Sequence, residues 1–224
     1  MAEQNSRDHG DLGARILYQD AGLVAVDKPW GMPTTGRRLD DPDCLQFGMI
    51  AHFGEMVWAV HQLDADTSGV NLFVRKKELV AEWKLRMLFP NGTKSYQAIV
   101  HGVAAFESRR IDSPVGFISG EAPQQLGVVA DGKRAVSEVR VLERGRQSTR
   151  VQVDIETGRT HQIRIHLASI GHAVVGDDWY GDVHPPAHMR QALHAWRVSF
   201  ADGIDPAALE SPVPRDMLDL WGSL

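Results

Sequence analysis

The 224-residue sequence contains one cysteine and no long hydrophobic run. Cys44 has no second cysteine with which to form an intramolecular disulfide, which is typical of proteins in a reducing compartment. No stretch approaches the roughly 18 apolar residues needed to cross a bilayer. Residues 1–14 contain no apolar segment of the kind that acts as a secretory signal. The sequence therefore predicts a cytoplasmic protein with no membrane role.

Basic residues are not in excess either. The formal net charge is −5, but residues 1–14 carry a net −2 and residues 201–224 a net −4, which leaves +1 on the body between them. Two interpretations of the cations in that body stay open, a basic groove for a polyanion or ordinary solvated faces. The clusters lie at residues 75–77, 109–110, 133–134 and 144–150.

A hydrophobic content of 43% over this length suits one domain with a substantial core. We expect residues 15–200 to form that domain and residues 1–14 to be a disordered or extended segment. Residues 201–224 should be an irregular acidic tail, because prolines interrupt them.

Hydrophobic periodicity predicts an α+β fold with a largely antiparallel mixed sheet and short flanking helices. Strands are expected at residues 16–19, 23–28, 94–102, 135–142, 149–157 and 193–200. Helices are expected from Pro42 with Asp41 as N-cap to a stop at Gly54, over residues 77–89, and over 161–170 with Thr160 as N-cap. Residues 111–134, rich in Pro and Gly, should form a long loop or an irregular hairpin.

The ten histidines raise the question of a metal site, but their spacing does not favour one. His161 and His166 lie roughly 140° apart around a helix, so they cannot bind one ion from that element. His184 and His188 are separated by a pair of prolines, and no thiolate pair exists. We expect neither a metal nor a cofactor.

One glycine-rich segment resembles a phosphate-binding loop. Residues 127–133, GVVADGK, match most of a phosphate-binding loop. However, Arg134 stands where Ser or Thr should bind magnesium, and a strand pattern follows in place of a helix. The match is therefore interpreted as accidental.

The segment HQLDADTSGVNLFV, residues 61–74, places acids and hydroxyls directly before an apolar run. Asp64 has apolar neighbours that restrict water around its carboxylate, which is typical of a reactive group. The alternative is a plain turn. Asp66-Thr-Ser-Gly69 also resembles an aspartic protease loop that lacks its second copy unless a homodimer supplies it, and Asp64 with Asp66 could be the acid and base of a hydrolase.

Residues 156–167 bring several hydrogen-bond donors to one short element. Arg159, Gln162, Arg164 and His166 lie at or near a predicted helix start, where donors and the helix dipole suit an anion. An ordinary capped helix with surface cations explains the same pattern.

Three segments together resemble the motifs of the RluA-type pseudouridine synthases. HQLDADTSGVNLFV is similar to the family's His-Arg-Leu-Asp-x-x-Thr-Ser-Gly loop and TKSYQAIVHG to its Lys-x-Tyr strand. ETGRTHQIRIHLASIGHAVVGD is similar to its Gly-Arg-x-His-Gln-x-Arg-x-His helix. Shorter matches occur at residues 27–31 and 193–195, and all follow the family's order across residues 15–200.

The resemblance implies the pseudouridine synthase fold and an enzyme that converts selected uridines of rRNA or tRNA to pseudouridine, as a monomer without cofactor or metal. Asp64 would be the catalytic carboxylate, attacking the nucleoside or removing a ribose proton, and Arg164 would keep it ionised. Tyr96 would lie against the uracil ring and act as a base at C5. The target nucleotide would be flipped out of its helix. The implied substrate-binding residues are His61, Gln62, Lys94, Arg159 and Gln162.

Gln62 departs from the family pattern, which has Arg at this position. In relatives that arginine helps to fill the space left by the extruded base, whereas a glutamine brings no charge and less reach. We also expect no small RNA-binding domain before residue 15. A non-catalytic RNA-binding or RNA-chaperone module on the same fold therefore remains the alternative.

Overall fold

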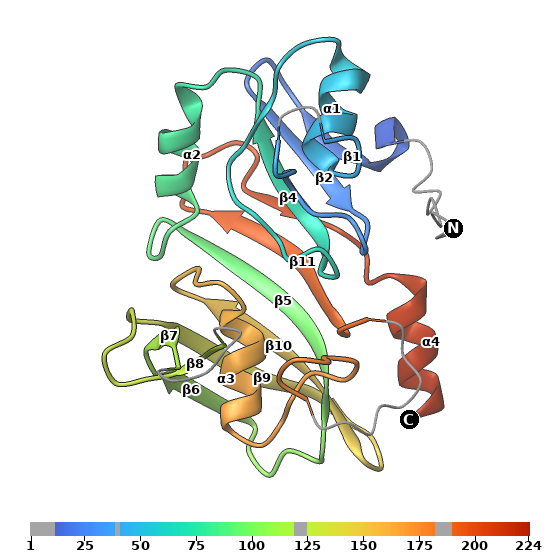
Figure 1. Cartoon of the computed structure of the whole chain (residues 1–224), viewed down its shortest axis with the longest axis vertical. Coiled ribbons are helices and arrows are strands. Elements are labelled where there is room, and N and C mark those ends of the chain that lie inside the picture. Colours follow the sequence, from blue (N-terminus) through green and yellow to red (C-terminus); the bar gives the residue numbers. More distant parts are fainter. Residues whose placement is uncertain (1–11, 39–40, 119–124, 182–189) are drawn as a thin grey trace.

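The computed structural model describes residues 12–38, 41–118, 125–181 and 190–224. Its centre is a ten-stranded sheet, and a separate two-stranded hairpin lies beside it (Figure 1). The sheet contains β1 (Ile16–Gln19), β2 (Leu23–Lys28), β3 (Trp58–Ala59), β4 (Ser68–Val74), β5 (Gly92–His101), β6 (Ser108–Asp112), β9 (Val136–Arg144), β10 (Ser148–Ile155), β11 (Leu193–Phe200) and β12 (Ala208–Glu210). The hairpin contains β7 (Val115–Phe117) and β8 (Leu126–Val128).

Four α-helices flank the sheet in the described part of the chain: α1 (Leu45–Phe53), α2 (Leu79–Arg86), α3 (Gln162–Ser169) and α4 (Arg215–Ser223). Figure 1 shows α1 and α2 beside the part of the sheet that holds β2 and β4, and α3 beside β9 and β10. This α+β architecture with a mostly antiparallel sheet confirms the predicted fold class. None of the helices in the described ranges is long and apolar enough to span a bilayer.

One parallel pairing interrupts the antiparallel order β1-β2-β4-β11-β5-β10-β9-β6. There β4 runs beside β11, with Gly69 opposite Ala195. A Cβ atom on Gly69 would lie 2.2 Å from the carbonyl oxygen of Ala195, and the φ of Gly69 is +113°. Glycine is therefore required, and the loop that precedes β4 is fixed to the middle of the sheet.

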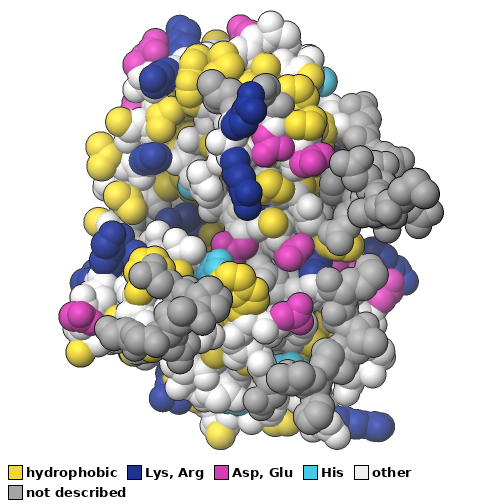
Figure 2. All heavy atoms as spheres, in the orientation of Figure 1, with side chains coloured by type: hydrophobic (Ala, Val, Ile, Leu, Met, Phe, Trp, Pro, Cys, Tyr) yellow, Lys and Arg dark blue, Asp and Glu magenta, His cyan; other side chains and the backbone are white. Residues whose placement is uncertain are grey.

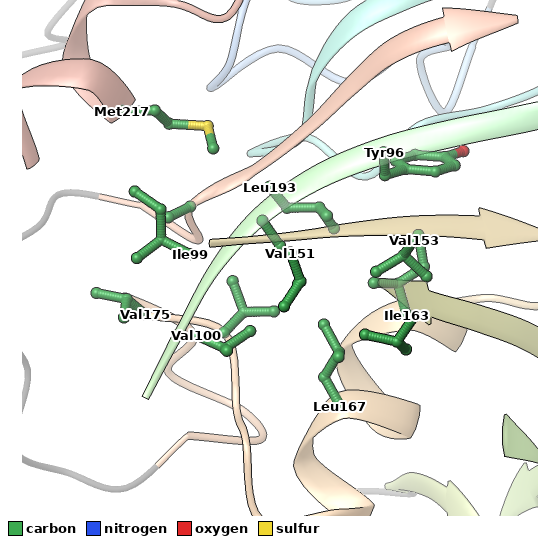
Figure 3. Packing of buried hydrophobic residues seen from close by; sticks show 14 of the residues in the cluster. Tyr96, Ile99, Val100, Val151, Val153, Ile163, Leu167, Val175, Leu193 and Met217 are labelled. Atoms are coloured by element: carbon green, nitrogen blue, oxygen red, sulfur yellow. The ribbon is translucent and has the colours of Figure 1, made fainter. Parts of the chain in front are cut away.

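The largest hydrophobic cluster fills the space between the sheet and α3. Ile163 and Leu167 of α3 lie next to Val151 and Val153 of β10 (Figure 3). Because alternate residues of β10 face the same side, its apolar positions meet the apolar stripe of the helix. This packing fixes α3 and the segment that leads into it.

Helices α1 and α2 have boundaries that differ from the predicted ones. Helix α1 begins at Leu45 with Cys44 as N-cap, whose Sγ accepts the N–H of Phe47 at 3.4 Å. Asp41 instead closes a local turn, because its carboxylate accepts the N–H of Asp43 at 3.2 Å. The predicted stop at Gly54 is confirmed, with φ +67°. Helix α2 is shorter than the predicted 77–89.

The predicted irregular tail is also wrong. Strand β12 pairs with β11, and α4 buries Met217 and Leu220 in the main cluster. The prolines lie outside the helix, with Pro214 at its N-cap position. They mark its boundary and do not prevent it. Of the segment 1–14, which was expected to be extended or disordered, residues 12–14 belong to a 3₁₀ turn, Leu12–Arg15, and residues 1–11 lie outside the described residues.

Residues 111–134 contain the β7–β8 hairpin, in agreement with the predicted irregular hairpin. Among its described residues no helix follows the glycine-rich segment, and Val136 begins β9. This agrees with the interpretation of the phosphate-loop match as accidental.

Candidate active site

A cavity of about 870 Å³ opens between the loop before β4 and the start of α3. The eight residues implied by the sequence motifs all contribute to its lining: His61, Gln62, Asp64, Lys94, Tyr96, Arg159, Gln162 and Arg164. They come from three segments that lie far apart in the sequence and are brought together by β4, β5 and β10. The fold therefore concentrates the predicted site in one place.

Asp64 lies in the turn before β4, where its carbonyl accepts the N–H of Thr67 at 3.0 Å. Its side chain keeps 28% of its exposure. The next residue, Ala65, is bound by the fully buried Lys28, whose Nζ donates to the carbonyl of Ala65 at 2.9 Å. Burial lowers the pKa of Lys28 to about 7, while the carboxylates of Asp66 and Asp64 act in the opposite direction.

Arg164 joins Asp64 to a second carboxylate. Its Nη1 donates to Oδ2 of Asp64 at 3.2 Å, while Nε and Nη2 each donate to Asp177 at 2.7 Å. The guanidinium also lies 5.1 Å from the ring centroid of Tyr180. Burial acts to lower the pKa of Arg164, but Asp177 and Asp64 raise it overall, so the side chain stays cationic.

The start of α3 differs from the prediction, because Thr160 is not its N-cap. His161 occupies that position with φ +55°, the left-handed region, which is uncommon for a residue other than glycine. Gln162 organises this segment. Its Oε1 accepts from Thr157 Oγ1 at 2.7 Å and from the Arg159 N–H at 3.1 Å, and its Nε2 donates to β9. The amide of Gln162 thus bonds within the protein and positions Arg159.

Tyr96 and Lys94 lie two residues apart on β5 and face the same side. Burial, with a contribution from Asp64, raises the pKa of Tyr96, so its hydroxyl is protonated in the free site. Burial and the nearby Arg159 lower the pKa of Lys94 to about 8. Lys94 can therefore exchange a proton slightly above neutral pH.

His61 lines the cavity, but its ring is tied to the sheet. Its Nε2 accepts the backbone N–H of Leu72 at 3.2 Å. Burial lowers the pKa of His61 to about 3, with Lys94 adding to the effect, so the ring is neutral. His61 therefore fixes the loop against β4 through a neutral nitrogen.

Several residues at this site were not singled out from the sequence. Three of them are Asp177, Tyr180 and Lys28. Asp177 fixes Arg164, the hydroxyl of Tyr180 lies 2.9 Å from Nδ1 of His161, and Lys28 donates to the carbonyl of Ala65. Asp177 ends the third matched segment and Lys28 lies in the short match at residues 27–31, so both had a signal. The ring of His161 was considered only as a metal ligand, yet its Nε2 lies 3.9 Å from Asp64.

Acidic side chains lie beside the cationic clusters in the described part of the chain. Figure 2 shows Lys and Arg side chains beside Asp and Glu side chains on one face of the molecule. Arginines of every cluster form ion pairs, namely Arg75 with Glu55, Arg110 with Glu138, Arg134 with Glu156, Arg144 with Glu107 and Arg150 with Glu143. The interpretation as solvated faces therefore fits better.

The part of the chain that the structure describes holds no group of three or more His, Cys, Asp or Glu side chains placed to bind a metal ion. His184 and His188 lie outside the described residues.

Comparison with known proteins identifies similar chains. The model of the RNA pseudouridylate synthase family matches residues 22–169. The RNA pseudouridine synthase YlyB of Bacillus subtilis is 35% identical over 93% of this chain and 72% of its own length. The ribosomal large subunit pseudouridine synthase D of Pseudomonas aeruginosa is 35% identical over 96% of this chain and 72% of its own length. Among solved structures, the human RNA pseudouridylate synthase domain containing 1 superposes with a TM-score of 0.72 at 27% identity, covering 89% of this chain and 82% of that one.

Proposed function

This chain belongs to the RNA pseudouridylate synthase family of isomerases, and we propose that it isomerises uridines of large-subunit ribosomal RNA with Asp64 as the catalytic carboxylate. The observation that carries this proposal is the bond from Arg164 to Asp64 at the wall of the cavity. Support for the RNA class comes from relatives that are named ribosomal large subunit pseudouridine synthases. Because all eight residues that the motifs imply meet in one cavity of one chain, we propose that a monomer is active.

The reaction rearranges one nucleotide and needs no co-reactant. The bond from C1′ of the ribose to N1 of uracil breaks, the uracil turns, and a bond from C1′ to C5 forms. C5 loses a proton and N1 gains one, so atoms and electrons balance. Asp64 starts this sequence either by attacking the nucleoside or by removing a ribose proton.

Both routes require an ionised Asp64. Nη1 of Arg164 donates to Oδ2 of Asp64 at 3.2 Å, so the reacting carboxylate has a cationic hydrogen-bond partner. The side chain of Asp64 keeps 28% of its exposure, so part of it can contact a ribose in the cavity. Arg164 thus stabilises the charge and directs the carboxylate, in our proposal, toward the bound nucleotide.

Tyr96 supplies a flat apolar ring for the uracil and a hydroxyl near the reacting atoms. Because its pKa is raised, the hydroxyl is protonated before RNA binds. It can accept the C5 proton only after giving up its own proton, and N1 of the uracil, which gains one proton in the reaction, is the acceptor. The raised pKa also makes the resulting phenolate a strong base, which suits removal of a proton from carbon.

The target uridine must leave its helix before Asp64 can reach the glycosidic bond, so we propose base flipping into the cavity. Gln62 is exposed in the cavity lining and can hydrogen-bond the base left behind. Lys94 and Arg159 supply positive charge for the nucleotide's phosphates.

The test is a map of pseudouridines in ribosomal and transfer RNA from a strain in which the gene is deleted. We expect one or more large-subunit rRNA positions to revert to uridine and to be restored by the purified protein on unmodified rRNA transcript. An unchanged map together with no product in vitro would overturn the proposal. Loss confined to transfer RNA would overturn the proposed substrate but not the reaction.

A further inference from the structure

Trp179 is a large aromatic side chain that lies beside the cavity and stays 60% exposed. Its ring packs edge-on against His161, with centroids 5.3 Å apart and planes at 85°. His161 lines the cavity, whereas Trp179 lies just outside that lining. The indole therefore occupies the lip of the candidate active site and has free surface there.

The backbone of Trp179 is anchored to the same carboxylate that fixes Arg164. Oδ1 of Asp177 accepts the N–H of Trp179 at 3.0 Å and the N–H of Tyr180 at 3.2 Å. The carbonyl of Trp179 accepts a hydrogen bond from Gln125 Nε2 at 3.4 Å. Isolated exposed hydrophobic residues are common, but the backbone of Trp179 is bound to the carboxylate that also fixes Arg164.

We propose that the indole of Trp179 is a stacking platform for a nucleobase adjacent to the target uridine. This inference rests on the proposed function. When a uridine enters the cavity, the bases beside it lose a stacking partner at the cavity mouth. An exposed indole at that lip offers a replacement face, and aromatic stacking is the usual way in which proteins bind unpaired RNA bases.

The ligand of this subsite is the π-face of a base. Every nucleobase has such a face, so the subsite contributes affinity and register without selecting one base. Arg159, which is exposed and contributes to the cavity lining, supplies charge for the RNA backbone close to the same mouth. The contact forms on binding and does not touch the reacting atoms.

The test compares Trp179→Ala and Trp179→Phe with wild type on unmodified large-subunit rRNA transcript. We expect Trp179→Ala to raise KM about 5- to 150-fold, the range for one stacked base, with kcat within about threefold because ground-state binding alone is lost. Trp179→Phe should recover most of the affinity, since it keeps an aromatic face. Leu218→Ala, an exposed apolar residue of α4 outside the cavity lining, is the matched control and should leave KM unchanged.

An unchanged KM in Trp179→Ala overturns the inference, and so does a fall in kcat without a change in KM. Tryptophan fluorescence gives a readout that needs no turnover. RNA should quench the wild-type emission, and Trp179→Phe should remove part of that quenching. If wild type makes no pseudouridine but the quenching difference persists, the proposed function fails and the stacking subsite stands. If wild type is active and neither variant differs, only the subsite fails.

Discussion

Asp64 and Asp177 bind the same guanidinium from two different loops, and their surroundings differ. Asp177 has no exposed side-chain surface, and it forms two bonds of 2.7 Å with Arg164. Asp64 keeps 28% of its side-chain exposure and forms one bond of 3.2 Å. The saturated carboxylate holds the arginine in place, and the less saturated one is available to a substrate. Burial and hydrogen-bond number thus distinguish the acid that fixes Arg164 from the acid that we propose reacts.

The two loops also belong to different parts of the sheet. The Asp64 loop leads into β4 and is anchored through Lys28, while Asp177 lies between α3 and β11. The parallel pairing of β4 with β11 joins these parts. The active site therefore depends on a long-range junction, and variants of the two acids should separate chemistry from architecture.

The largest change in stability should follow Asp177→Asn. Removing this charge leaves Arg164 buried without its main partner, which costs about 3–5 kcal/mol. The melting temperature should fall by roughly 6–20 °C. Thermal unfolding followed by circular dichroism measures it. Asp64→Asn is the control, and equal destabilisation by both variants would break the comparison.

Tyr96→Phe should be the next largest effect, because it keeps the ring but removes the proton acceptor. We expect kcat to fall about 10²-fold or more, with KM within about threefold. Single-turnover kinetics measures the loss. Tyr18→Phe removes a hydroxyl from β1, outside the cavity lining, and should be silent. Full activity in Tyr96→Phe would leave Tyr96 with only a packing role.

Lys94 should give the rate a dependence on pH. Its pKa is lowered to about 8, so the ammonium is present below that pH and is lost above it. If the charge binds RNA, kcat/KM falls above about pH 8 by at most tenfold per unit. Lys94→Arg keeps the charge and should remove the decline. An identical profile in both proteins would show that another group titrates.

The smallest effect should follow Gln62→Arg. One added cation in the cavity lining should tighten RNA binding by about 1.4- to 5-fold at low salt. Gln147→Arg adds the same charge on the exposed turn between β9 and β10 and is the matched control. Salt-dependent binding curves measure both. If Gln147→Arg raises RNA affinity as much as Gln62→Arg does, the gain comes from net charge and not from the position of residue 62.

The sequence predicted the strands that became β1, β2, β5, β9, β10 and β11, and its motifs named eight residues that line the cavity, because alternating patterns and short motifs are local signals. It did not predict β3, β6 or β12. It did not predict how α3 begins. Thr160 offered a local cap, but the hydrogen bonds of Gln162 to Thr157 and to β9 determine the backbone there. The contact to β9 joins residues distant in sequence, and no local pattern predicts it.

The C-terminal helix α4 was not predicted for a similar reason. A helix of nine residues is marginal by itself, and the nearby prolines suggested irregular structure. Its stability comes from Met217 and Leu220, which pack into the main cluster. The role of Asp177 was equally hidden, since an acid at the end of a motif does not show that it forms two bonds to Arg164.

The most direct test of the account is the single-turnover rate of Asp64→Asn on RNA that the wild-type protein modifies, measured together with RNA affinity and melting temperature. The exchange keeps the shape of the side chain and removes its charge. We predict a rate at least about 10³-fold below wild type, with affinity within about threefold and an unchanged melting temperature. A variant that folds, binds RNA and forms pseudouridine at near the wild-type rate would contradict the assignment of Asp64.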